Sequence, residues 1–132
     1  ASLLLSPRDH HIVATLGVSA EGVPQFAMVD SNGKPRVMLR LEEKDGPVFS
    51  MSDENGKPRV LLSLGENDAP MFVMCDENGK PRVRLNVNED GDTLLGFFDG
   101  GGECRAVLGT AEDGSSRIRF IDENGDVVFE AP

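Results

Sequence analysis

The chain has 132 residues, 39% of them hydrophobic and 27% charged, which is typical of one folded domain. Its 13 Lys plus Arg against 23 Asp plus Glu give a formal net charge of −10, which opposes binding to nucleic-acid phosphates and argues against nucleic acid as a partner. No apolar run approaches the roughly 18 residues of a membrane helix, and the opening residues lack the basic flank of a signal peptide, so we expect no membrane insertion by this segment.

A glycine recurs every 23 residues along the chain, at Gly33, Gly56, Gly79, Gly102 and Gly125. Around the first three, the motif Asp-x-Asn-Gly-Lys-Pro-Arg-Val occupies residues 30–37, 53–60 and 76–83. One period earlier, a degenerate unit begins the chain. The sequence therefore predicts a single domain over residues 1–132, made of six tandem units at approximately 1–18, 19–41, 42–64, 65–87, 88–110 and 111–132.

Each unit is expected to form a β-hairpin. An Asn-Gly pair between two alternating segments predicts a two-residue type I′ turn. In the unit centred on Asn55-Gly56, this turn places Phe49 opposite Leu62 and Met51 opposite Val60. The connections between hairpins are also short, so consecutive hairpins should be antiparallel neighbours, with Leu62 beside Phe72. The fold class is therefore all-β, an up-and-down antiparallel meander of up to 12 strands.

The alternation gathers large apolar side chains on one face of this sheet, Phe49, Met51, Val60 and Leu62 among them. At roughly 1.5 to 3 kcal/mol for each large side chain that is fully buried, this face must be buried. We expect the meander to close into a flattened barrel or a three-sided prism, with residues 2–6 pairing with residues 126–131. The alternative is a trimeric β-fibre in which several chains share one core.

The candidate ligand or interaction site is a row of arginines on the other face, since Arg36, Arg59, Arg82 and Arg105 hold one equivalent position in successive units. Such a row could bind an anion. The alternative is that each arginine supports the packing of the sheet and is neutralised by the acidic turns. Phe98 belongs to the same candidate site and is expected to stack between Arg82 and Arg105.

The other chemically distinctive residues predict no catalytic, metal or cofactor site. The loop Asn88–Asp92 is acidic and contains a glycine, but the spacing of a helix-loop-helix calcium site is absent, and the motif aspartates are expected to cap their own turns. His10 and His11 are adjacent and should point to opposite faces. Cys75 and Cys104 are expected on opposite faces with two strands between them, as free thiols.

The repeated Asp-x-Asn-Gly-Lys-Pro-Arg-Val motif resembles arrays of about 23 residues in uncharacterised bacterial proteins, some of which carry membrane segments upstream. The resemblance covers nearly the whole chain, weakens in the first and last units, and implies no activity. The leading hypothesis is a non-enzymatic structural or interaction module that binds a protein partner or associates with itself, and a homo-oligomer is one form this could take. The alternative is a small ligand-binding domain, either lectin-like or binding anions at the arginine row.

Overall fold

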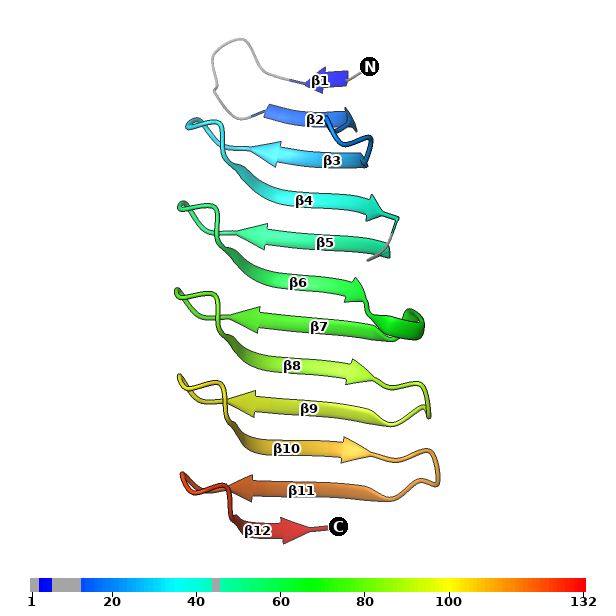
Figure 1. Ribbon diagram of the computed structural model, residues 1–132, viewed down its shortest axis with the longest axis vertical. Helices are drawn as coiled ribbons and strands as arrows, with labels where there is room; N and C mark the ends of the chain where they lie inside the picture. The colour runs from blue at the N-terminus through cyan, green and yellow to red at the C-terminus, as the bar shows by residue number, and fades with distance from the viewer. Residues whose placement is uncertain (1–2, 6–12, 44–45) are drawn as a thin grey trace.

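The computed structural model describes residues 3–5, 13–43 and 46–132. These residues form one antiparallel sheet of 12 strands in which every strand pairs with its neighbours in sequence, so the predicted all-β meander is confirmed (Figure 1). One 3₁₀ turn, η1 (Glu66–Asp68), lies between β6 and β7. The strands are β1 (Leu3–Leu5), β2 (Val13–Val18), β3 (Pro24–Val29), β4 (Pro35–Glu42), β5 (Gly46–Ser52), β6 (Pro58–Leu64), β7 (Pro70–Cys75), β8 (Pro81–Val87), β9 (Thr93–Phe98), β10 (Cys104–Thr110), β11 (Ser116–Ile121) and β12 (Val127–Ala131).

The predicted register is confirmed along the body of each hairpin. Phe49 pairs with Leu62 and Met51 pairs with Val60. The short connection to the next hairpin keeps the alternation, because Leu62 also pairs with Phe72. Since paired residues share a face, apolar side chains continue across the sheet from strand to strand.

The predicted type I′ turn is wrong. Both central residues of that turn need a positive φ, but within the Asp53–Lys57 turn only Gly56 has one, at 81°. The Gly56 amide donates to the Asp53 carbonyl and the Asp53 amide donates to the Lys57 carbonyl, which is the pattern of a type I turn followed by a glycine bulge. A further shift in the pairing between Met51 and Ser52 leaves Arg59 without a strand partner. The motif therefore encodes a longer, bulged hairpin turn.

The expected closure of the sheet is also wrong. β1 pairs with β2 and β12 pairs with β11, and these two strands lie at opposite ends of the open sheet (Figure 1). The expected pairing of residues 2–6 with 126–131 is therefore absent from the described part of these segments. Figure 1 shows the strands stacked with little change of direction, and a sheet that twists and coils so little does not bring its first and last strands together.

The apolar face is consequently not buried within one chain, contrary to expectation. The side chain of Leu62 is 50% exposed, and Phe97 is 44% exposed. The buried hydrophobic residues among those described are Ala27, Val48 and Val73, which belong to the opposite face. The sheet is a single layer, and no second layer of the chain packs on its apolar face. The residues that alternation marks as a core face are therefore open to solvent.

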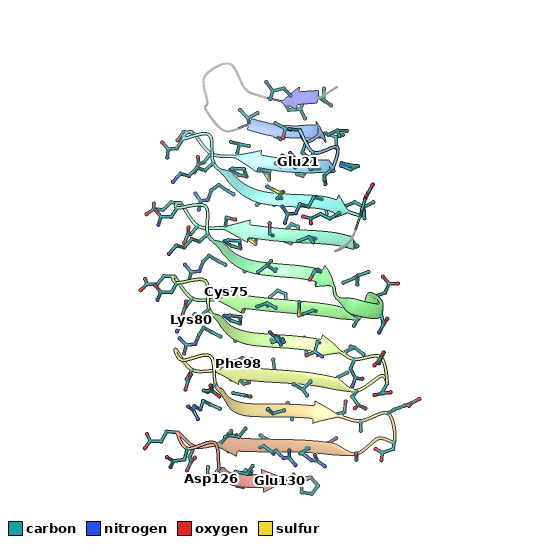
Figure 2. All side chains as sticks on the ribbon, in the orientation of Figure 1. Glu21, Cys75, Lys80, Phe98, Asp126 and Glu130 are labelled. Atoms are coloured by element: carbon teal, nitrogen blue, oxygen red, sulfur yellow. The ribbon has the colours of Figure 1, made fainter. Side chains whose placement is uncertain are left out.

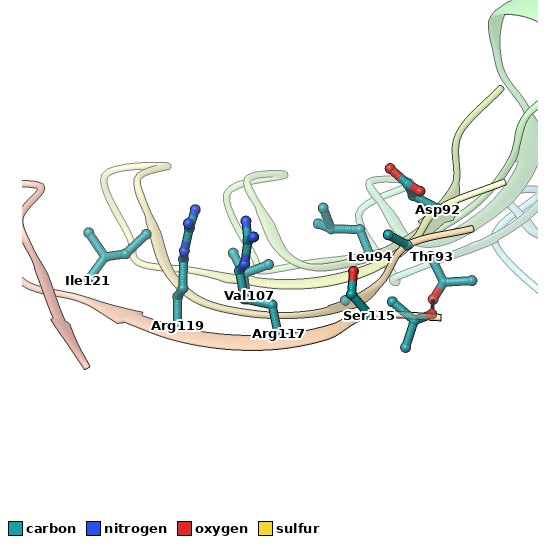
Figure 3. A pocket seen from close by; sticks show the side chains of 11 residues that line it. Asp92, Thr93, Leu94, Val107, Ser115, Arg117, Arg119 and Ile121 are labelled. Atoms are coloured by element: carbon teal, nitrogen blue, oxygen red, sulfur yellow. Dashed lines mark hydrogen bonds between the residues drawn. The ribbon is translucent and has the colours of Figure 1, made fainter. Parts of the chain in front are cut away.

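The sheet bends away from its apolar face. Figure 3 shows the strand that carries Arg117 and Arg119 curving toward the side on which these arginines and Val107 lie. Val107 pairs with Arg119, whereas the apolar Leu108 pairs with Ile118, so the apolar face is the convex one. Side chains converge on a concave surface, which agrees with the burial of small residues such as Ala27 there. We call this second surface the concave face.

Candidate functional site

The repeated motif builds one edge of the sheet, here called the turn edge (residues 30–34, 53–57, 76–80, 99–103 and 122–126). In the second of these turns, Asp53 Oδ1 accepts hydrogen bonds from the amides of Asn55, at 2.9 Å, and Lys57, at 3.1 Å. The other four motif aspartates accept the equivalent pair of amide hydrogen bonds. The expected capping role of these aspartates is therefore confirmed.

These hydrogen bonds explain the acidity of the capping carboxyls. The pKa of Asp53 is lowered, chiefly because the Lys57 amide donates to the carboxylate. Amide donors likewise head the causes that lower the pKa values of Asp30, Asp76 and Asp122. For Asp99 the Arg105 side chain is the largest cause, and the pKa falls to about 2. All of these turns therefore keep their negative charge at neutral pH.

The motif arginines connect each unit to the next one along the sheet. Arg59 Nε donates to the carbonyl oxygen of Cys75 at 2.9 Å, and Arg59 Nη1 lies 3.7 Å from Asp53 Oδ2. Arg36 and Arg82 repeat both contacts in their own units. In the fifth unit Arg105 turns its Nε to Asp99 at 2.7 Å, and its Nη1 donates to the Asp122 carbonyl.

The motif lysines form a second set of links beside the first. Lys34 Nζ donates to the Glu54 carbonyl at 2.7 Å, Lys57 Nζ to the Glu77 carbonyl at 2.9 Å, and Lys80 Nζ to the Gly100 carbonyl at 2.6 Å. Each lysine thus connects its own turn to the turn of the following unit. The lysine and arginine of each motif therefore bind the main chain of the following hairpin.

The candidate arginine row is therefore already engaged by the protein. Arg36, Arg59 and Arg82 each direct Nε at a main-chain carbonyl and one Nη at a carboxylate, which reduces their capacity to bind a free anion. Phe98 does stack against an arginine, but the predicted partner is wrong. The guanidinium of Arg84 lies over the ring, 5.7 Å from its centroid. The alternation predicted that Arg82 and Arg105 would reach this ring, but the bulge beside each motif arginine changes the direction of its side chain.

A hollow of about 330 Å³ lies on the concave face, near the C-terminal end of the sheet (Figure 3). Gly109 forms part of its lining, and Arg117 and Arg119 stand along it. Both arginines contact the same carboxylate oxygen of Glu130 on β12, at 3.2 and 2.9 Å. Sequence reasoning missed this hollow, although a glycine inside a strand pattern signals missing side-chain volume. Glu130 already neutralises part of the positive charge beside it.

The remaining residues singled out from the sequence do not converge. Asn88 Oδ1 accepts the amides of Asp90 and Asp92, so the side chain of Asn88 caps this loop as the motif aspartates cap theirs. Within residues 3–5, 13–43 and 46–132, three or more metal-ligating side chains nowhere come together. His10 and His11 lie outside the described residues.

The two cysteines are free, as predicted, and β8 and β9 separate them. Their expected placement on opposite faces is wrong. Cys104 pairs with Phe98, which occupies in its unit the position of Cys75 in the preceding one. The bulge at Arg105 causes this change, because it shifts the alternation by one residue. Burial raises the pKa of the Cys75 thiol, which makes it a weaker nucleophile at neutral pH.

The apolar face consists of three rows that run across the strands. The middle row is Leu3, Leu16, Phe26, Leu39, Phe49, Leu62, Phe72, Leu85, Leu95, Leu108, Ile118 and Ala131. The turn-side row is Leu5, Ala14, Met28, Val37, Met51, Val60, Met74, Val83, Phe97, Ala106, Phe120 and Phe129. The loop-side row is Val18, Pro24, Leu41, Pro47, Leu64, Pro70, Val87, Thr93, Thr110 and Ser116.

None of these three rows contains a charged residue, although the chain is rich in charge. Figure 2 shows the polar side chains concentrated along the two edges of the sheet. Soluble monomers rarely leave more than a few hundred Å² of continuous apolar surface open to water. A face of this extent is typical of a surface that another molecule covers.

The chain matches no protein family and no curated protein in sequence. Nor does any helix in the described segments have the length and apolar character to span a bilayer.

Proposed function

We propose that the chain is a non-enzymatic structural or interaction module that packs its apolar face against protein. The observation that carries the proposal is the uncharged face of three rows, which runs the whole length of the sheet and is open to solvent in the single chain. The rest of the architecture supports this role. The motif side chains hold the hairpins at a constant spacing, which keeps a long surface regular.

Ligand binding at the arginine row has less support, because the Nε of Arg36, Arg59 and Arg82 is directed at protein carbonyls. The hollow beside Arg117 and Arg119 has Glu130 as a built-in counter-charge. An anionic ligand would have to displace this carboxylate. Each guanidinium of the arginine row already faces a carboxylate, and in the hollow Glu130 and Asp92 together match the charges of Arg117 and Arg119, so neither place offers the uncompensated positive charge that an anion site needs.

The proposal is tested by photo-crosslinking inside the cells that produce the protein. Leu62 on the apolar face and Leu94 on the concave face are each replaced by p-benzoyl-phenylalanine; they are matched because their side chains are 50% and 40% exposed. We expect irradiation to join position 62, and not position 94, to a protein, which mass spectrometry identifies. Absence of a protein adduct at position 62 would overturn the proposed function.

A further inference from the structure

We propose that the partner of the apolar face is the chain itself: three copies assemble around an axis parallel to the long dimension of the sheet, with equal strands at equal heights and all apolar faces inward. The inference rests on the proposed function, because it names the partner of the same face. Three properties of the face support it: its area, the shape of its rows and its curvature.

The area is sufficient for a stable assembly. With neighbouring strands about 4.8 Å apart and a rise of about 3.3 Å per residue, the face measures roughly 50 Å by 20 Å. Each copy can thus bury on the order of 1,000 Å², compared with about 800 Å² per partner in a standard interface. Three faces about 20 Å wide also enclose a prism whose centre is about 6 Å from each sheet, near half of the roughly 10 Å between packed sheets. The middle row can therefore fill the axis.

The two outer rows have complementary profiles. On the turn-side row from β1 to β11, the odd-numbered strands carry large residues, such as Met51 on β5, and the even-numbered strands carry small ones, such as Val60 on β6. On the loop-side row the order is reversed, with Pro47 on β5 and Leu64 on β6. A rotation about the long axis brings the turn-side row of one copy against the loop-side row of the next at the same height. Met51 then faces Pro47, and Val60 faces Leu64.

This match extends through most of the sheet. Met28 and Met74 occupy the position of Met51 in the neighbouring units, and Pro24 and Pro70 occupy that of Pro47. From β3 to β7 a larger side chain meets a smaller one at every height, as close packing of a core requires, and Phe97 with Thr93 on β9 and Phe120 with Ser116 on β11 continue the pattern. An unrelated partner would need the same repeat of two strand spacings to fit this surface, whereas a second copy has it by construction.

The curvature favours three copies over two. Two sheets that both bend away from their apolar faces, as Figure 3 shows for this one, touch along their middle rows and separate toward both edges. In a three-fold arrangement each half of the convex face packs against a different neighbour, so both outer rows remain covered. The bend of the sheet would open a gap between two copies, but it lets the two halves of each sheet pack against two different neighbours in a trimer.

Both edges of the sheet are acidic. On the turn edge the three lysines Lys34, Lys57 and Lys80 stand among ten acidic residues, and the opposite edge also carries acidic residues, such as Glu89 and Asp113. The assembly is therefore stabilised by the apolar rows and not by charge pairing between the edges. The same acidity disfavours an anionic membrane surface as the occupant.

The first test is the mass of the purified full chain by light scattering. We expect three times the chain mass of 14.2 kDa. The variant Leu62→Glu places three carboxylates at the axis and should give a monomer, whereas Leu94→Glu, on the concave face, should remain a trimer. A wild-type monomer or dimer, a trimer that survives Leu62→Glu, or sedimentation of the wild type with phosphatidylcholine vesicles would each overturn the inference.

The second test does not depend on the folding of a charged variant. Met51→Cys and Pro47→Cys are combined in a background with Cys75→Ser and Cys104→Ser. The two new thiols are four residues apart on β5, about 13 Å, which is too far for a disulfide within one chain. Oxidation should give a covalent trimer on a non-reducing gel. A product that stops at a dimer, or a chain that remains uncrosslinked, would contradict the proposed packing.

The two proposals fail in different ways. If position 62 crosslinks to a different protein while the purified chain is a monomer, the interaction function stands and the trimer is wrong. If position 62 crosslinks to no protein, the interaction function itself is wrong. Adducts between copies of the chain, together with the trimeric mass, support both.

Discussion

Arg59 Nε donates a 2.9 Å hydrogen bond to the main-chain carbonyl oxygen of Cys75, which lies in the following repeat unit. The carbonyl belongs to the end of β7, close to the place where the pairing between β7 and β8 shifts. The same side chain reaches back to Asp53 of its own turn. One arginine in each of units two to five therefore joins its own turn to the next hairpin.

Loss of this link should destabilise the fold. Arg59→Met keeps the apolar stem but removes the donor to the Cys75 carbonyl, so we expect the free energy of unfolding to fall by about 1 kcal/mol. Arg84→Met is the matched control, because Arg84 contacts the face of Phe98 and should cost about 0.5 kcal/mol. Urea unfolding at one fixed chain concentration measures both. Equal losses would mean that the arginine link contributes nothing specific.

The acidity of Asp99 predicts a pH dependence with a definite sign. Its pKa is lowered from 3.8 to about 2 in the folded chain, first by the Arg105 side chain. A carboxyl with a depressed pKa contributes stability that is present above its unfolded pKa and is lost as the pH falls through the folded value. Asp99→Asn should therefore be less stable than the wild type at pH 6, and this difference should disappear between pH 4 and pH 2.

Urea unfolding at several pH values checks this expectation. The comparison of two chains that differ at one carboxyl cancels the effect of the other acidic groups, which also become protonated in this range. Asp90→Asn is the control, because Asp90 is an acidic loop residue whose carboxyl accepts neither of the capping bonds of its loop. A difference between the wild type and Asp99→Asn that grows toward pH 2 would contradict the assignment.

Two glycines of the turn edge should respond in opposite directions to the same substitution. Gly56 has a φ of 81°, so Gly56→Ala places a side chain in the left-handed region and should cost about 1 kcal/mol or more. The φ of Gly100 is not positive, and there is open space around the position of a Cβ atom at this residue. Gly100→Ala should therefore be neutral or stabilising, by up to about 1 kcal/mol. Thermal unfolding of both variants gives the comparison, and a stabilising Gly56→Ala would show that the bulge is absent.

The sequence was sufficient to predict the order of the strands and the register, because Asn-Gly turns and strict alternation fix both locally. It was not sufficient to predict the turn type, since Asn55-Gly56 serves a two-residue turn and a bulged turn equally well. The motif arginine does not make this choice, because the same bulged turn forms at residues 122–126, where Val128 stands in its place. The alternation also identified Phe49 and Leu62 as one face. What covers that face is decided by twist and curvature, which the pattern of single residues does not contain.

For the candidate site too, the sequence predicted the positions of residues but not their contacts. The equivalent positions of the motif arginines were readable from the repeat, but their partners were not, because Arg59 lies in the bulge and leaves the predicted alternation. Phe98 was expected between Arg82 and Arg105 for that reason, and it contacts Arg84. The hollow above Gly109 depends on the bend of the strands and on Glu130 of the last strand, and neither follows from local pattern.

A strained loop offers a stabilising substitution. Asn67 and Asp68 both have positive φ values, 55° and 58°, and the residue one period after Asp68 is Gly91, with a φ of 84°. Asp68→Gly should therefore relieve strain and raise the free energy of unfolding by about 0.5 to 1 kcal/mol. Asp90→Gly is the matched control: Asp90 lies one period after Asn67, has no positive φ, and its replacement should cost about as much through added freedom of the unfolded chain. Urea unfolding at equal chain concentration separates the two, and a destabilising Asp68→Gly would mean that this loop is held in its unusual conformation by the Asp68 side chain.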